Sequence, residues 1–134
     1  MNDCIFCKIV KKEIPSISVY EDEDTLAFME LSPSAPGHLM VIHKKHGYSI
    51  LEYTQEELGK IMATTQVVAK KLKKAVNADW LSIGINHHEK AGVPHLHIHL
   101  IPRFNNDKGG VMQSLVKNPP KESREAIAEK IRKA

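Results

Sequence analysis

The sequence predicts an α+β fold in which one long helix packs on an antiparallel sheet of about five strands. Two patterns carry this prediction. Residues 95–101 alternate histidine with bulky apolar residues, as expected of a β-strand with one face in a core. Residues 54–77 repeat apolar side chains at helical spacing, and the other apolar segments are short and separated by turn residues.

Five segments combine β-forming residues with flanking turn residues. The first two are joined by the acidic turn Asp22-Glu23-Asp24, and the third follows a loop that contains Pro33, Pro36 and Gly37. The last two come after the long helix. The expected strands cover residues 18–22, 25–30, 38–43, 81–85 and 95–102.

The long helix has clear start and stop signals. Thr54 and Glu57 have the spacing of a capping box, and Tyr53 is placed to contact Leu58 across the first turn. Asn77 is a suitable stop, and the lysines before it suit the negative end of the helix dipole. The apolar positions expected to face the sheet are Leu58, Ile61, Met62, Thr65, Val68, Ala69, Leu72 and Val76.

The composition is that of one globular domain. The 134 residues are 42% hydrophobic and 26% charged, which is sufficient for a core. The net charge of +3 is scattered, so no nucleic-acid partner is expected. No apolar run approaches the ~20 residues of a membrane span, and Met1-Asn2-Asp3-Cys4 lacks a signal-peptide pattern. We therefore expect a cytoplasmic protein without a membrane partner.

The pattern changes after Arg103. Residues 1–104 contain every predicted strand and the long helix, whereas residues 105–134 are expected to be a loop and helical extension of the same domain. Only Ile127 and Ile131, with a few alanines, give the terminal helix an apolar face. A weakly docked appendage and a partner contact both remain open.

The histidine row is the strongest chemical signal. His95, His97 and His99 should lie on one face of their strand. At about 3.3 Å per residue, the Cα atoms of His95 and His99 would be about 13 Å apart, too far for both rings to bind one zinc ion. A mononuclear metalloenzyme built on the whole row is therefore disfavoured. Imidazole is a nucleophile and exchanges protons near neutral pH, so a catalytic row is favoured over chance surface histidines.

A Cys-x-x-Cys pair, Cys4 and Cys7, lies near the N-terminus. A lasting disulfide is not expected in a reducing compartment, where metal binding or redox chemistry is the usual role. No thioredoxin-like βαβ pattern follows the pair. Two reduced cysteines without a metal remain the alternative.

Taken in order, these motifs resemble the histidine-triad (HIT) superfamily, in particular its zinc-containing bacterial or archaeal members. The name-giving motif is His-x-His-x-His followed by two apolar residues. The resemblance implies a HIT-like fold and a homodimer formed through helix and sheet. The matching motifs are Ile5-Phe6, Leu31-Ser32-Pro33, Ala35-Pro36-Gly37-His38, Lys44-Lys45-His46, Asn86, the triad and Ile101-Pro102-Arg103.

The resemblance also implies an activity. His97 would attack the α-phosphorus of a nucleoside 5′-phosphoryl substrate and form a nucleotidyl-histidine that water then hydrolyses. His99 would protonate the leaving group or hold the phosphate, and His38 would lie on the phosphate side. The expected function is hydrolysis of nucleoside phosphoramidates or related nucleotidyl compounds, with a purine nucleotide such as AMP as product. The alternatives are a dinucleoside polyphosphate hydrolase and a non-catalytic purine nucleotide-binding protein.

Positions implied for nucleotide binding follow from the same resemblance. Glu30 stands where many relatives carry an aspartate that accepts hydrogen bonds from the ribose hydroxyls, and glutamate keeps the acceptor while adding a methylene. The implied substrate-binding residues are Ile5, Phe6, Ile9, Phe28, Glu30, Leu31 and Asn86.

The loop before the triad is shorter than in most relatives. Ala91-Gly92 runs directly into Val93-Pro94, without the glutamine and small hydroxyl residue that normally help to hold the α-phosphate. Backbone N–H groups or one of His87, His88 and Lys90 would then take that role.

In zinc-containing relatives two histidines complete the cysteine pair: the one after Lys-Lys and the first of the triad. The resemblance thus implies a closed, structural zinc site of Cys4, Cys7, His46 and His95. His97 and His99 would remain available for chemistry.

Overall fold

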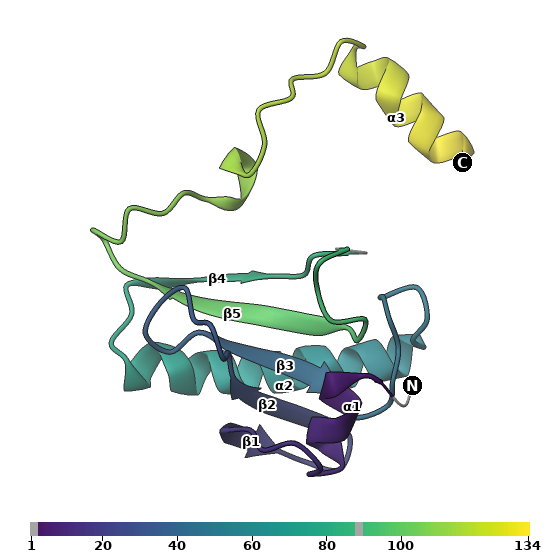
Figure 1. The fold of residues 1–134 in the computed structure, drawn as a ribbon. Helices are drawn as coiled ribbons and strands as arrows, with labels where there is room; N and C mark the ends of the chain where they lie inside the picture. The colour runs from purple at the N-terminus through teal and green to yellow at the C-terminus, as the bar shows by residue number, and fades with distance from the viewer. Residues whose placement is uncertain (1–2, 88–89) are drawn as a thin grey trace.

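The fold is described by a computed structural model that covers residues 3–87 and 90–134. Five antiparallel strands form one sheet in the order β1-β2-β3-β5-β4, and the helices α1 and α2 cover its opposite faces (Figure 1). The predicted α+β fold is confirmed. The strands are β1 Ser18–Glu21, β2 Thr25–Met29, β3 Leu39–His43, β4 Trp80–Gly84 and β5 His97–Arg103, and the helices are α1 Ile5–Val10, α2 Gln55–Ala75 and α3 Arg124–Lys133, with one 3₁₀ turn at Met112–Ser114.

Alternation along the strands divides the core into two layers. One layer lies between the sheet and α2, and includes Leu96, Ile98 and Leu100, the apolar residues that alternate with the triad. The other layer lies under α1, where Phe6 packs with Phe28 and their ring centroids are 5.3 Å apart. The triad segment thus has a core face, as predicted, and its histidines lie on the α1 side of the sheet.

The short helix α1 was not expected from the sequence. Six residues are too few to show a periodic pattern, and the residue at its N-cap is an unusual one. Cys4 caps α1 by accepting the backbone N–H of Cys7 on its Sγ at 3.5 Å. Lys12, with φ of 63°, then turns the chain away from the helix.

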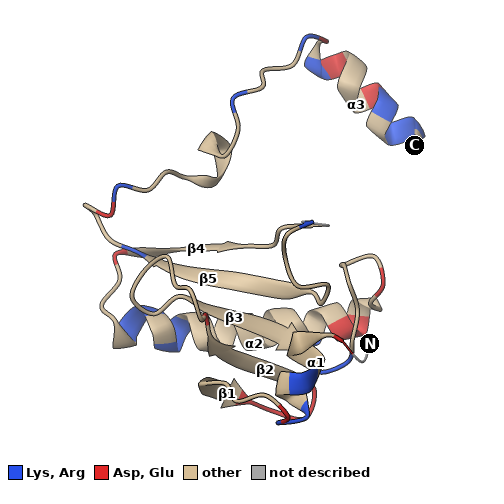
Figure 2. Cartoon of the chain, in the orientation of Figure 1, with Lys and Arg blue, Asp and Glu red and all other residues tan. Residues whose placement is uncertain are grey.

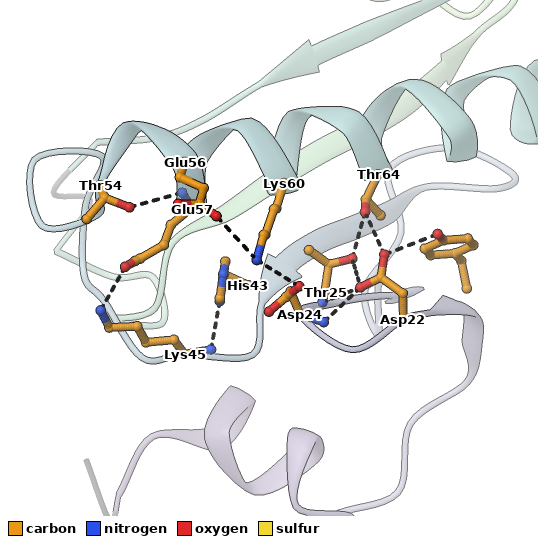
Figure 3. A network of polar contacts seen from close by, with 11 residues as sticks. Asp22, Asp24, Thr25, His43, Lys45, Thr54, Glu56, Glu57, Lys60 and Thr64 are labelled. Atoms are coloured by element: carbon orange, nitrogen blue, oxygen red, sulfur yellow. Dashed lines mark hydrogen bonds and ion pairs between the residues drawn. The ribbon is translucent and has the colours of Figure 1, made fainter.

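The long helix α2 begins as predicted, with Thr54 accepting the N–H of Glu57 at 3.1 Å. One position of the predicted stripe is wrong, because Met62 is 57% exposed. Thr64 is buried instead and shares a 2.6 Å hydrogen bond with Thr25, which joins α2 to the first residue of β2 (Figure 3). The buried stripe is therefore rotated towards β2.

The strand that carries the triad begins at His97, two residues later than predicted. His95 and Leu96 are bonded outside the β5 ladder. The N–H of His95 donates to Val93 O at 2.8 Å, and the N–H of Leu96 donates to Gly47 O at 2.7 Å. His95 thus precedes the ladder, and its side chain is fully buried on the α1 side of the sheet, beside the Phe6 ring that also meets His97.

After β5 the chain leaves the sheet as an arm, residues 104–134, whose root is fixed by Arg103. The guanidinium donates to Asp107 Oδ2 at 2.7 Å and to Gly110 O at 2.6 Å, and it lies 4.1 Å from the centroid of the Trp80 ring. The Arg103 guanidinium also holds the pKa of Asp107 well below its usual range. The buried guanidinium of Arg103 therefore fixes the direction in which the arm leaves the sheet.

The terminal helix α3 stands away from the sheet at the end of the arm (Figure 1). Among its described residues none is buried. Its charges are mixed, whereas α2 has acidic residues at its N-terminal end and lysines at its C-terminal end (Figure 2). Within the described part of the chain, no helix is long and apolar enough to cross a membrane.

Candidate active site and metal centre

The triad divides into a pair and a single residue. His97 and His99 are half-buried on β5, and their ring centroids are 4.9 Å apart. His95 is fully buried and faces the cysteines of the α1 segment. The three histidines therefore do not form one continuous row, and two different kinds of chemistry become available.

Hydrogen bonding fixes the proton on His97. Its Nδ1 lies 2.7 Å from the carbonyl oxygen of His95. A carbonyl can only accept, so Nδ1 carries the proton and the lone pair lies on Nε2. An imidazole in this tautomer presents Nε2 as a nucleophile.

A second set of bonds fixes the proton on His99. The backbone N–H of Ser34 donates to His38 Nδ1 at 3.0 Å, so the proton of a neutral His38 is on Nε2. That Nε2–H donates to His99 Nδ1 at 3.0 Å, which leaves the His99 proton on its own Nε2. His97 thus offers a lone pair where its neighbour His99 offers a proton.

The same bonds argue against a metal between Glu30, His38 and His99, although their ligand atoms lie within 4.8 Å of one another. A histidine that binds a metal through Nε2 keeps its proton on Nδ1. In His38 that nitrogen is already the acceptor for Ser34. This cluster is better described as a hydrogen-bonded relay.

Burial lowers the pKa of His38, with Glu30 acting in the opposite direction. Because the folded state disfavours the charged ring, the unfolded chain binds more protons below pH 6.5. We expect the contribution of His38 to the free energy of unfolding to be at its maximum above pH 6.5 and to decrease as the pH drops below this value. His38→Asn, which keeps an acceptor for Ser34 but does not titrate, should show a shallower loss in urea unfolding between pH 7 and 5. Parallel curves for the two proteins would contradict this assignment.

A metal-binding set is assembled from three separate segments. Cys4, Cys7, His46 and His95 have their ligand atoms within 4.8 Å of one another. Cys7 Sγ lies 3.2 Å from His46 Nδ1, and His95 Nδ1 lies 3.5 Å from Cys4 Sγ and 3.6 Å from Cys7 Sγ. The four residues predicted as ligands are thus brought together.

The chemistry of these four residues fits zinc. The Nε2–H of His95 donates to His43 O at 2.8 Å, so its Nδ1 lone pair points at the thiols. Burial lowers the pKa of His95 to about 4, which keeps the ring in the neutral form that a ligand requires. Burial and the neighbouring Cys4 raise the pKa of Cys7, and a cation would reverse that effect. Two thiolates and two imidazoles are a common structural zinc set.

The residues expected to contact a nucleotide base are only partly grouped. Phe6, Ile9 and Phe28 are buried in the layer under α1, and Phe6 meets the His97 ring edge-on with centroids 5.1 Å apart. Ile5 lies at the surface of the same helix, 48% exposed. Leu31 is 87% exposed, so it lies at the rim rather than in the wall.

Three of the polar residues expected at the phosphate and ribose, Glu30, Asn86 and His87, lie near the pair. Glu30 follows β2, and its N–H donates to His38 O at 3.1 Å. Asn86 and His87 line a water-sized cavity beside His97. Lys90 is exposed, and His88 lies outside the described residues.

A larger cavity of about 590 Å³ shares Ile85 and Asn86 with the small one and reaches His99. This volume is within the usual range for small-molecule sites. Gly84 at the end of β4 and Asn86 just after it line one wall, and Met112 and Leu115 line it from the arm. A Cβ at Gly84 would lie 3.1 Å from the Met112 methyl, so the arm crosses the edge of β4 closely at this point.

Comparison with known proteins agrees with this geometry. A profile of the HIT domain matches residues 11–106, which is most of the chain. This chain belongs to the HIT domain family. An adenosine 5′-monophosphoramidase of Saccharomyces cerevisiae is 38% identical over 108 residues, or 79% of this chain and 66% of that protein.

Solved structures of HIT proteins share the fold. A protein from Streptococcus mutans is 43% identical with a TM-score of 0.88, over 99% of this chain and 85% of that chain. A zinc-bound histidine triad protein from Mycobacterium smegmatis is 31% identical with a TM-score of 0.75, over 99% of both chains. The Cys/His cluster of this HIT protein lies partly outside the matched domain, since Cys4 and Cys7 precede residue 11.

Sequence reasoning missed three contributors to the site. Ser34 acts through its backbone N–H, which no residue preference reveals. The carbonyl of His43 accepts the Nε2–H of His95, a contact that depends on β3 lying beside the triad segment and that the sequence does not reveal. The arm residues Met112 and Leu115 looked like part of an irregular linker, although their apolar side chains in a polar segment were a usable signal.

Proposed function

We propose that this HIT protein hydrolyses nucleoside 5′-phosphoramidates or closely related nucleotidyl compounds and releases a purine nucleotide such as AMP. The observation that carries the proposal is the pairing of tautomers on β5. His97 has its lone pair on Nε2, and His99 beside it has its proton on Nε2. The yeast phosphoramidase relative supports this choice of substrate.

In the first step His97 Nε2 attacks the α-phosphorus, and the bond from phosphorus to the leaving nitrogen breaks. The leaving amine must gain a proton. His99 Nε2–H is the donor placed to supply it when the His38–His99 pair carries one extra proton, so that the transfer leaves both rings neutral. His38 Nε2–H, bonded to His99 Nδ1, stabilises this orientation. In the second step water attacks phosphorus, the P–N bond to His97 breaks, and the proton of that water restores His99.

The two sides of the pair suit the two parts of such a substrate. The nucleoside would lie towards Phe6 and Glu30, on the α1 side. The leaving group would enter the cavity under the arm, beside His99. The charged side chains that line that cavity besides His99 are Arg103 and Asp107, and these two are paired with each other, so uncharged amines suit it best.

Zinc bound by Cys4, Cys7, His46 and His95 would have a structural role. Its four protein ligands leave no open position for substrate or water. The zinc would tie α1, which carries Phe6, to the segment just before His97.

Steady-state kinetics tests the proposed function. Adenosine 5′-phosphoramidate should turn over with a higher kcat/KM than diadenosine tetraphosphate. The reverse order would favour a dinucleoside polyphosphate hydrolase. AMP binding without turnover of either compound would favour a non-catalytic nucleotide-binding protein, for which the shortened loop before His95 is the supporting observation.

We expect Glu30 to read the ribose. A hydrogen bond to a charged acceptor contributes roughly 1.5–3 kcal/mol, so AMP should bind about ten- to a hundredfold tighter than 2′,3′-dideoxy-AMP. Glu30→Gln should lose part of this preference and Glu30→Ala nearly all of it. Calorimetric titration with both ligands measures the preference. Equal affinities for wild type would show that Glu30 does not contact the sugar.

We also propose a homodimer. β4 is an edge strand with exposed apolar side chains at Ile83 and Ile85 beside it, 40% and 38% exposed. An isolated helix as short as α3 is marginal in water, so a second copy would give it a surface to pack on. Light scattering should give a molar mass of two chains at micromolar concentration. A mass of one chain would rule the dimer out.

A further inference from the structure

A second buried histidine, His43, lies beside the metal-binding set. His43 ends β3 and is 6% exposed. It is linked to both histidines of that set, since it lies three positions before His46 in the chain and its carbonyl contacts His95. Its own side chain is not among the ligand atoms of the set.

The ring of His43 shapes the turn that leads to His46. The backbone N–H of Lys45 donates to His43 Nδ1 at 2.9 Å, as Figure 3 shows. Tyr53 closes the same turn by donating its hydroxyl to Lys45 O at 2.7 Å, and its ring lies 5.6 Å from that of His43. The direction in which the chain leaves β3 towards His46 is therefore set by the His43 ring.

The carbonyl of His43 orients the other histidine ligand. It accepts the Nε2–H of His95 at 2.8 Å, which is the bond that points His95 Nδ1 at the thiols. One residue thus fixes both imidazoles of the set, through its ring for His46 and through its main chain for His95.

The remaining nitrogen of this ring faces an unusual environment. Because Nδ1 accepts from Lys45, the proton of the neutral ring is on Nε2. This Nε2 and Glu57 Oε2 are the two buried side-chain atoms without a hydrogen-bond partner in the described part of the chain. One is a donor and the other an acceptor, and among neighbouring charges that of Glu57 acts most strongly on the ring. Buried polar groups are rarely left unpaired, and an ordered water commonly joins such atoms.

We propose that His43 is a positioning residue for the two histidine ligands, and that one buried water joins its Nε2–H to Glu57 Oε2. The N-terminal turn of α2 would then hold the ring that in turn holds the metal site. The inference rests on the zinc site proposed above. Residues that orient metal ligands typically change metal affinity by about ten- to a hundredfold when removed.

Three substitutions at His43 separate its two ring contacts. His43→Asn keeps an acceptor near the position of Nδ1, His43→Gln keeps a donor near that of Nε2, and His43→Leu keeps neither. Zinc affinity is measured by competition with a chromogenic chelator. We expect His43→Leu to bind zinc about ten- to a hundredfold more weakly. The Asn and Gln variants should each recover part of that loss.

Glu57→Ala should weaken zinc binding severalfold, although Glu57 is not a ligand. Lys45→Met is the matched control, because it removes only the 2.8 Å ion pair between Lys45 and Glu57 and should leave zinc affinity unchanged. A crystal structure at high resolution should show a water within hydrogen-bond distance of both His43 Nε2 and Glu57 Oε2.

Two further outcomes are decisive. If His43→Leu lowers the stability of the zinc-free protein but leaves zinc affinity unchanged, His43 is only a packing residue and the proposal is overturned. If the wild type binds no zinc, the proposed metal site fails by itself. The pairing of His43 with Glu57 is then tested without zinc, by the bridging water in the crystal structure and by the stability of the zinc-free Asn and Gln variants relative to His43→Leu. If the water is absent and neither variant recovers stability, the pairing is overturned too.

Discussion

His97→Ala is expected to lower kcat for adenosine 5′-phosphoramidate by at least about a thousandfold. The variant lacks the only lone pair that the tautomer pattern directs to an attacking position, since the proton of His99 is on its Nε2. AMP affinity should stay within about tenfold of wild type, because the lost ring acts mainly in the covalent step. His97→Gly should behave in the same way.

Two controls make this result interpretable. Thermal unfolding of each variant should match wild type within a few degrees, because the His97 ring is only half-buried. AMP titration then separates loss of chemistry from loss of binding. A variant that retains more than about one part in thirty of the wild-type rate would refute the nucleophile assignment.

The second large effect concerns the metal. We expect one zinc per chain, and we expect Cys4→Ser to lower stability by about 3 kcal/mol when free zinc is about a hundredfold above the dissociation constant. For a chain of this size the loss corresponds to a Tm lower by about 10 °C. Serine is a good N-cap, so the substitution keeps the cap of α1 and removes only the thiolate.

A chelator provides the matched comparison. Chelated wild type and chelated Cys4→Ser should unfold at nearly the same temperature, because neither then gains from zinc. Metal analysis of purified protein checks the stoichiometry directly. Well under one zinc per chain, together with an unchanged Tm for Cys4→Ser, would exclude the structural zinc site.

Much of the fold could be predicted because the strongest patterns are local. The alternation at residues 95–101 and the cap at Thr54 each report on one strand or one helix, and the structure places both close to the predicted bounds. Met62 was misplaced because rotation of α2 is set by the contact of Thr64 with Thr25, which is distant in sequence. The helix α1 was missed because six residues carry too little pattern.

In the candidate site, too, some features could be predicted from the sequence and others depend on contacts between distant segments. Side chains that carry chemistry, such as Cys4, His46 and His97, could be named from spacing and from family resemblance, and the structure brings the four expected ligands together. Backbone groups could not be named, although the N–H of Ser34 and the carbonyl of His95 decide where the protons lie. The division of the triad into one ligand and one catalytic pair depends on the position of His95 before β5 and beside Cys4 and Cys7, which alternation alone does not predict.

The most direct measurement is rapid quenching of the reaction, followed by intact and peptide mass analysis. Protein mixed with excess adenosine 5′-phosphoramidate and quenched in alkaline denaturant, which preserves phosphoramidate bonds to histidine, should carry one AMP per chain on the peptide that contains His97. His97→Ala should carry none. Turnover by wild type without any adduct, or an adduct on another residue, would contradict the proposed mechanism.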